Sequence, residues 1–146
     1  EPRDVLMSRA NTTQLLGSVV FVSEVTAHLL LCDKLYRLHI SEDRLDREYA
    51  VAFLRSGPRR FLFEQEATGA SNSMQNIGQD TVCNTWILIP PLPEQRTIVS
   101  QLNTHRQRVN SLTRALQDST RLLKERRSAL ITAAVTGQIP VEEMAQ

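Results

Sequence analysis

The fold of this chain is decided at residues 90–99, which read PPLPEQRTIV. Prolines at positions 90, 91 and 93 interrupt a strand and favour an extended approach followed by a helix start. Between Pro93 and Gly137 the sequence contains no further glycine or proline. The pattern therefore predicts two parts. Residues 1–91 form a small α+β domain, and residues 92–146 form one long α-helix with a short C-terminal tail.

Apolar residues in the predicted helix recur at alternating steps of four and three, which is the heptad pattern of a coiled coil. In one series every seventh residue is apolar, whereas the second series is half polar and includes His105. Polar residues at such positions set the register or the partner of paired helices. The predicted coiled-coil interface consists of Ile98, Leu102, His105, Val109, Leu112, Leu116, Leu123 and Leu130.

The predicted helix needs a partner. Residues 94–136 number 43, and at about 1.5 Å per residue they form a rod of roughly 60 Å. A small domain cannot cover such a rod, so we expect the apolar seam to pack against a second helix. That helix can come from a second copy, from another part of a longer chain or from another protein. The alternative is a long core helix within a single globule.

The first 91 residues show short apolar stretches between turn signals. Expected strands are Asp4–Ser8, Ser18–Val22, Leu29–Cys32, Leu35–Ile40 and Thr85–Ile89. Expected helices are Asp46–Leu54, where apolar residues recur at helical spacing, and a second from Pro58 to about Glu66. Residues 67–73 are small and polar and predict a loop.

The composition is that of an ordinary folded protein. The chain has 146 residues, of which 41% are hydrophobic and 23% are charged, and this balance argues against intrinsic disorder. Its longest apolar runs, Gly17–Val22 and His28–Cys32, are far too short to span a membrane. The first residue is Glu1 rather than Met and no signal-peptide pattern follows, so we expect part of a longer chain.

No residue pattern points to catalysis or metal binding. Cys32 and Cys83 show no CxxC spacing, so they indicate neither a zinc site nor a disulfide framework, and a reducing cytoplasm is expected. Both cysteines are expected to be small buried hydrophobes. The histidines, His28, His39 and His105, lie far apart in the sequence. No phosphate-binding loop, GxGxxG, HExxH or methyltransferase NPPF/Y motif occurs.

The charges that sum to the net charge of +1 are distributed unevenly between the two parts of the chain. Residues 1–91 hold nine basic and eleven acidic residues, whereas residues 92–146 hold eight and five. Fifteen of the 17 basic residues are arginine, which suits carboxylates, phosphates and guanine edges. A GC-rich genome explains the same bias, so charge alone does not argue for nucleic acid. The arginines at positions 59 and 60 open a predicted helix and are expected to be solvated.

Several motifs occur in a fixed order along almost the whole chain. Residues 4–12 (DVLMSRANT) match a strand and turn of the form DxLxSRxNT, and residues 33–38 (DKLYRL) and 67–71 (ATGAS) follow. Residues 90–99 carry the PLP, EQ and IV elements of a helix-start signature, and residues 122–139 (LLKERRSALITAAVTGQI) form the matching helix end, with Gly137 as its cap. Together these stretches resemble the specificity subunits of type I restriction-modification systems.

The resemblance implies a DNA-recognition subunit without catalytic activity. In that family two target recognition domains each read one half of a split duplex target, and their conserved helices pack antiparallel as a spacer. DNA adenine methyltransferase (modification) subunits dock there and use S-adenosylmethionine, while ATP and Mg²⁺ belong to the restriction subunit; this chain is expected to hold no cofactor. The chain is expected to correspond to the C-terminal part of the second recognition domain together with the conserved helix that follows it. A half-length subunit trimmed at its front is the alternative.

Candidate DNA contacts are polar residues in turns beside strands. They are Arg9, Asn11, Thr12, Lys34, Arg37, Ser71, Asn72 and Ser73. Arginine and asparagine can bond bidentately to guanine and adenine edges, and Lys34 and Arg37 flank a turn from which they can reach phosphate. The alternative for Asn11 and Thr12 is a turn in which they bond to their own backbone. The Gly69 region is expected to be structural or turned toward the modification subunit.

Other functions stay open at this point. A coiled-coil dimerisation module whose front domain binds protein fits the heptads equally well, and homodimerisation through the long helix would accompany it. A salt-dependent preference for one DNA duplex separates this function from DNA recognition. An independent hydrolase using Ser, Cys or His is opposed only by the absence of a motif.

Overall fold

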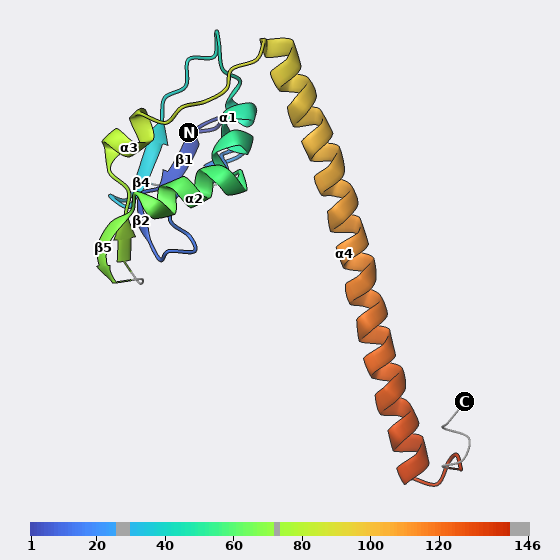
Figure 1. Cartoon of the computed structure of the whole chain (residues 1–146). Helices are drawn as coiled ribbons and strands as arrows, with labels where there is room; N and C mark the ends of the chain where they lie inside the picture. The colour runs from blue at the N-terminus through green and yellow to red at the C-terminus, as the bar shows by residue number, and fades with distance from the viewer. Residues whose placement is uncertain (26–29, 72–73, 141–146) are drawn as a thin grey trace. The chain divides into compact units, whose positions relative to one another are not determined.

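The computed structural model describes residues 1–25, 30–71 and 74–140. It divides into two compact units, one from Glu1 to Gln101 and one that begins at Leu102, and each is described by itself. Two small β-sheets and three short helices form the first unit, and a long helix continues into the second (Figure 1). The predicted mixed α/β class with a long C-terminal helix is confirmed. The boundary expected between residues 91 and 92 stays a prediction.

Three antiparallel strands form the first sheet in the order β3-β1-β4. They are β1 (Val5–Ser8), β3 (Val19–Phe21) and β4 (Leu35–Leu38), and each matches an expected strand. Because side chains alternate along a strand, β1 sends Val5 and Met7 into the core, where they are 1% and 0% exposed. The turn before β3 needs a glycine, since Gly17 has φ 69° and an added Cβ would lie 3.1 Å from Phe63.

A second sheet follows the order β2-β6-β5. Its strands are β2 (Ala10–Asn11), β6 (Met74–Asn76) and β5 (Thr68–Ser71). The loop expected at residues 67–73 is therefore wrong over Thr68–Ser71, where backbone pairing with β6 forms a strand despite the polar sequence. Gly69 allows this pairing, because a Cβ there would lie 2.4 Å from the backbone oxygen of Met74.

Two helices complete the core of the first unit. Helix α1 (Arg47–Leu54) begins where the carboxylate of Asp46 accepts hydrogen bonds from the backbone N–H groups of Glu48 and Tyr49. Helix α2 (Gly57–Gln65) has a proline in its first turn, which suits a helix start. Both helices match the expected ones. The core they share with the first sheet consists of Val5, Met7, Leu16, Val19, Val51, Leu54, Phe63 and Ile77.

Two expected strands are wrong. Residues 30–32 form no strand, while Leu29 and His28 lie outside the described residues. After helix α3 (Gln79–Cys83), residues 85–89 form no strand either. A strand exists only through pairing, and among the described residues no neighbouring strand pairs with either stretch. Cys32 and Cys83 are both exposed, so the expectation that they are buried is also wrong.

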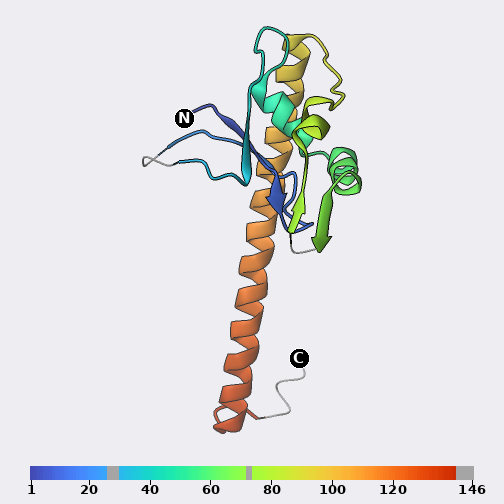
Figure 2. The same ribbon diagram turned by 90° about the vertical axis from the view of Figure 1, so that its left-hand side faces the viewer.

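Helix α4 (Leu92–Val135) has 44 residues. Figures 1 and 2 show it as one continuous helix. At about 1.5 Å per residue its length is roughly 66 Å. It ends as expected at Gly137, which has φ 71°, and the backbone N–H of Gln138 donates to the carbonyl oxygen of Ala133 at 2.8 Å. The predicted long helix and its C-terminal cap are therefore confirmed.

Candidate nucleic-acid interface

Arg9 lies at the junction of the two sheets. Its backbone N–H donates to the carbonyl oxygen of Lys34 at 2.9 Å, and its own carbonyl accepts from the N–H of Ile77 at 2.8 Å. These bonds tie the end of β1 to the residues before β4 and after β6. The short connection from β1 to β2 therefore brings three segments that are far apart in the sequence to one place.

The Arg9 side chain is held over an aromatic ring. Its guanidinium carbon lies 5.4 Å from the centre of the Tyr36 ring, a distance at which cation and ring attract. The Tyr36 hydroxyl donates to the carbonyl of Ile77 at 3.1 Å, which fixes the ring in turn. The Nε of Arg9 is buried and has no hydrogen-bond partner among the described residues. The cation is thus preorganised by stacking.

Asn11 and Thr12 form a turn. The Asn11 side-chain oxygen accepts from the backbone N–H of Thr12 at 2.8 Å, and its amide nitrogen donates to the Ser8 hydroxyl at 3.2 Å. The carbonyl of Thr12 accepts from two later N–H groups, which closes the turn before Gly17. The structure thus shows for Asn11 the local bonding that its alternative interpretation predicts. Contact with a base edge requires the Asn11 amide to exchange these bonds.

Lys34 is exposed and lies beside Asn11. With Ala10 and Met74 these two residues line a hollow of about 210 Å³. Met74 pairs across the hairpin with Ser71, so the end of the β5–β6 hairpin lies at the same place. Asn72 and Ser73 lie outside the described residues. We call the surface formed by Arg9, Asn11, Lys34 and Met74 the Arg9 corner.

Arg37 lies apart from the Arg9 corner. It follows Tyr36 in β4, so the two side chains point to opposite faces of the sheet, and Arg9 stacks on the Tyr36 face. Its Nε is 3.1 Å from a carboxylate oxygen of Asp4. The charge of Arg37 is therefore already paired within the domain.

Two arginines expected to be solvated are not. Arg59 is 9% exposed, stacks 4.4 Å from the centre of the Phe63 ring and donates to the Thr85 hydroxyl at 2.7 Å. Arg60 donates to the Ser18 hydroxyl at 3.2 Å. The long aliphatic stems pack on the core while the guanidinium groups reach polar atoms. The expectation of solvated side chains at 59 and 60 is wrong.

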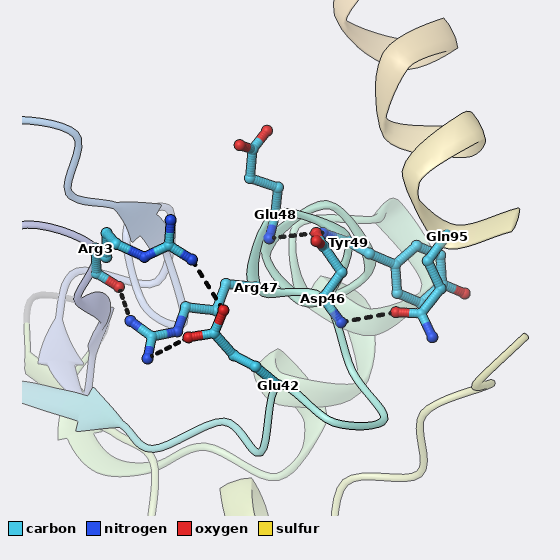
Figure 3. A network of polar contacts seen from close by, with 7 residues as sticks. All are labelled: Arg3, Glu42, Asp46, Arg47, Glu48, Tyr49 and Gln95. Atoms are coloured by element: carbon cyan, nitrogen blue, oxygen red, sulfur yellow. Dashed lines mark hydrogen bonds and ion pairs between the residues drawn. The ribbon is translucent and has the colours of Figure 1, made fainter. Parts of the chain in front are cut away.

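Gln95 is fully buried at the start of α4, and the sequence did not predict this burial. Its side-chain oxygen accepts from the N–H of Asp46 at 2.8 Å, and its amide nitrogen donates to the carbonyls of Arg44 and Pro90 at 2.9 and 2.7 Å. Figure 3 shows it beside the N-terminus of α1. One side chain thus joins the first turn of α4 to the cap of α1. The place of Gln95 in the EQ motif was the signal in the sequence that pointed to this role.

An ion-pair cluster lies next to this contact (Figure 3). Glu42 accepts from Arg3 at 2.9 Å and from Arg47 at 2.7 Å, and Arg47 also donates to the carbonyl of Arg3. Because Arg47 is the first residue of α1, the cluster ties that helix to the residues before β1. Arg3 and Arg47 therefore stabilise the fold of the domain.

The predicted seam of α4 is largely exposed in this chain. Leu102, Leu116 and Leu123 are 49%, 68% and 65% exposed, and Ile98 and Leu130 are half-buried. Together with Val109, which is 59% exposed, these leucines recur every seven residues on a continuous helix and form an apolar stripe. The stripe provides a surface for a partner helix, and coiled-coil pairing itself stays a prediction.

The structure thus combines a small α/β domain with one long helix that carries an exposed apolar seam. The chain is similar in sequence to the EcoEI specificity subunit of type I restriction enzymes from Escherichia coli, at 25% identity over 132 residues, which cover 90% of this chain and 22% of that protein. It is 28% identical to the Escherichia coli EcoBI specificity subunit over 114 residues, covering 78% and 23% respectively.

The resemblance to type I specificity subunits that the motifs predicted is thereby confirmed over most of this chain. The chain spans less than a quarter of the length of these curated relatives. No family model matches it. Among the described residues no helix is long and apolar enough to cross a membrane, and no three His, Cys, Asp or Glu side chains cluster as a metal site would require.

Proposed function

We propose that this chain is the DNA-recognition part of a type I restriction-modification specificity subunit. In this proposal the α/β domain reads one half of a bipartite duplex target, and α4 serves as spacer and as docking helix. The observation that carries the proposal is the extent of the similarity. An alignment of 132 residues is far longer than the 44 residues of α4, so a shared heptad pattern alone does not explain it.

The Arg9 corner is the proposed contact with DNA. Arg9 is preorganised over Tyr36, and the exposed residue Lys34 accepts a hydrogen bond from the backbone N–H of Arg9 through its own carbonyl. A guanidinium can bond bidentately to a guanine edge, whereas an ammonium is better suited to phosphate. We therefore assign base contact to Arg9 and phosphate contact to Lys34. Arg37 is given no such role, because Asp4 already pairs with it.

Catalysis is assigned to partner subunits. In the proposed complex DNA adenine methyltransferase subunits bring S-adenosylmethionine, and a restriction subunit brings ATP and Mg²⁺. The contribution of this chain is then geometric. A helix of 44 residues sets a fixed distance of roughly 66 Å, so the separation of the two half-targets would follow from its length.

The proposal is tested by mapping methyladenine across the genome of cells that express the complete specificity subunit with its methyltransferase. We expect a bipartite target, one half of which is changed or lost on Arg9→Ala. Lys34→Ala should instead lower methylation at all sites without changing the target, because a phosphate contact carries no sequence information. Arg55→Ala is the control, because Arg55 is an exposed arginine at the end of α1 outside the Arg9 corner. An unchanged target in Arg9→Ala would refute the base contact, and unchanged methylation levels in Lys34→Ala would refute the phosphate contact.

The second candidate is a coiled-coil dimerisation module whose front domain binds protein. The exposed leucine stripe of α4 favours it, since such a stripe needs an apolar partner. A salt-dependent preference of the complete subunit for one duplex would exclude this candidate. Binding that is insensitive to DNA sequence, together with a stable homodimer, would support it.

A further inference from the structure

An apolar groove of about 590 Å³ lies beside strand β4 in the first unit. Its lining includes Tyr36 and Leu38 of β4, Ala50 and Leu54 of α1, and Ile87 and Ile89 of the segment before α4. Ala50 and Leu54 are 0% and 4% exposed, so the groove reaches the packed core. A groove lined this way is suited to apolar side chains.

The groove opens on the edge of β4. Successive residues of the strand line it, Tyr36, Arg37 and Leu38, although their side chains alternate between the two faces of the sheet. In the sheet order β3-β1-β4 this strand is outermost, so among the described residues only β1 pairs with it. A strand edge presents backbone N–H and carbonyl groups that favour the addition of another strand.

The opposite wall has the side-chain pattern of a strand. Thr85, Ile87 and Ile89 line the groove, whereas the alternate residues Trp86 and Leu88 are 91% and 76% exposed. Hydrogen bonds hold the wall in place: the Thr85 hydroxyl accepts from Arg59 at 2.7 Å, and the carbonyl of Leu88 accepts from the Tyr49 hydroxyl at 3.0 Å. Residues 85–89 thus have the side-chain pattern of a strand and are held by hydrogen bonds. They lie across the groove from the edge of β4.

We propose that the groove receives one additional β-strand with alternating apolar side chains, contributed by a part of the polypeptide outside residues 1–146. The strand pairs with the edge of β4 and places its apolar side chains between Leu38 and Ile87. The lengths of the relatives favour this source, since the chain matches only 22% and 23% of them. This inference concerns the completion of the domain and does not depend on DNA recognition.

Two cysteines provide the test. Cys83 lines the groove, whereas Cys32 is exposed and does not line it. The rate of maleimide labelling at each thiol is measured by mass spectrometry, in the 146-residue chain and in the complete polypeptide. We expect labelling of Cys83 to be at least roughly tenfold slower in the complete polypeptide, because burial restricts access to the thiol, with Cys32 as the reference.

Equal rates at Cys83 would overturn the proposal. Protection of Cys83 in the 146-residue chain that rises with a dimer mass would assign the groove to a second copy and also overturn it.

A matched pair of substitutions provides a second readout. Ile87→Arg places a charge in the groove, and Leu88→Arg places the same charge on the exposed side of the same segment. We expect Ile87→Arg to lower the Tm of the complete polypeptide by about 5 °C more than that of the 146-residue chain, where the groove is open to water. Leu88→Arg should change both little. An equal loss from Ile87→Arg in both proteins would contradict an added strand.

Discussion

Gln95 shows why a glutamine follows Glu94 at the start of α4. Only a side-chain amide supplies one acceptor and two donor hydrogens, and all three are used, by Asp46, Arg44 and Pro90. The three partners are backbone groups, so they do not depend on the side chains at those positions. The glutamine of the EQ element is thereby explained as a structural contact between the first turn of α4 and the start of α1.

Replacing Gln95 with leucine should destabilise the first unit. The change leaves one N–H and two carbonyl groups without a partner where water has little access, at a cost of about 3 kcal/mol or more in the free energy of unfolding. Denaturant unfolding measures the loss. Gln95→Glu keeps the acceptor but loses both donated bonds, so it should also destabilise. Gln107→Leu on the exposed part of α4 is the control, and an equal effect at both positions would contradict the role of Gln95.

Individual residues were predicted from the sequence only where their role is local. The cap at Gly137 follows from the glycine itself, and the turn at Asn11 and Thr12 was one of two interpretations. Burial of Arg59 depends on Phe63 and Thr85, and Cys83 is exposed where it lines the groove. Such tertiary surroundings are absent from a local pattern, so both were misassigned.

At the scale of elements, α4 combines a continuous helix with an exposed leucine stripe. Leu116→Asp places a carboxylate in the middle of that stripe, where pairing would bury it, so it should abolish association through the helix. Light scattering of the 146-residue chain measures the effect as a fall in molar mass to that of the monomer. Gln117→Asp adds the same charge next to the stripe and should leave the mass unchanged. A mass unaffected by Leu116→Asp would count against the seam.

The helices were predicted better than the strands, for a physical reason. Asp46 as a cap, Pro58 in a first turn and the absence of glycine and proline in α4 are all local signals. The second sheet instead depends on pairing between β2 and β6, which are more than 60 residues apart in the chain. Its polar strands give no alternating pattern, so the pairing that creates them could not be seen in the sequence.

At the scale of the whole molecule, charge limits what this chain does alone. Residues 1–91 hold nine basic against eleven acidic residues, and Arg37, Arg47 and Arg59 are engaged within the domain. Few cations then remain for phosphate, and affinity for DNA depends on the number of phosphates neutralised. We expect the 146-residue chain to bind duplex DNA weakly, with a Kd above about 1 µM near physiological salt. Fluorescence anisotropy measures it, and a nanomolar Kd would contradict the expectation.

Co-purification of the complete specificity subunit with the methyltransferase encoded beside it, with the mass determined by light scattering, tests the central proposal most directly. The proposed role predicts a stable complex of two methyltransferase subunits with one specificity subunit, since each conserved helix region offers a docking site. The absence of any complex, with a stable homodimer of the subunit in its place, would contradict DNA recognition within a restriction-modification enzyme and favour the coiled-coil module.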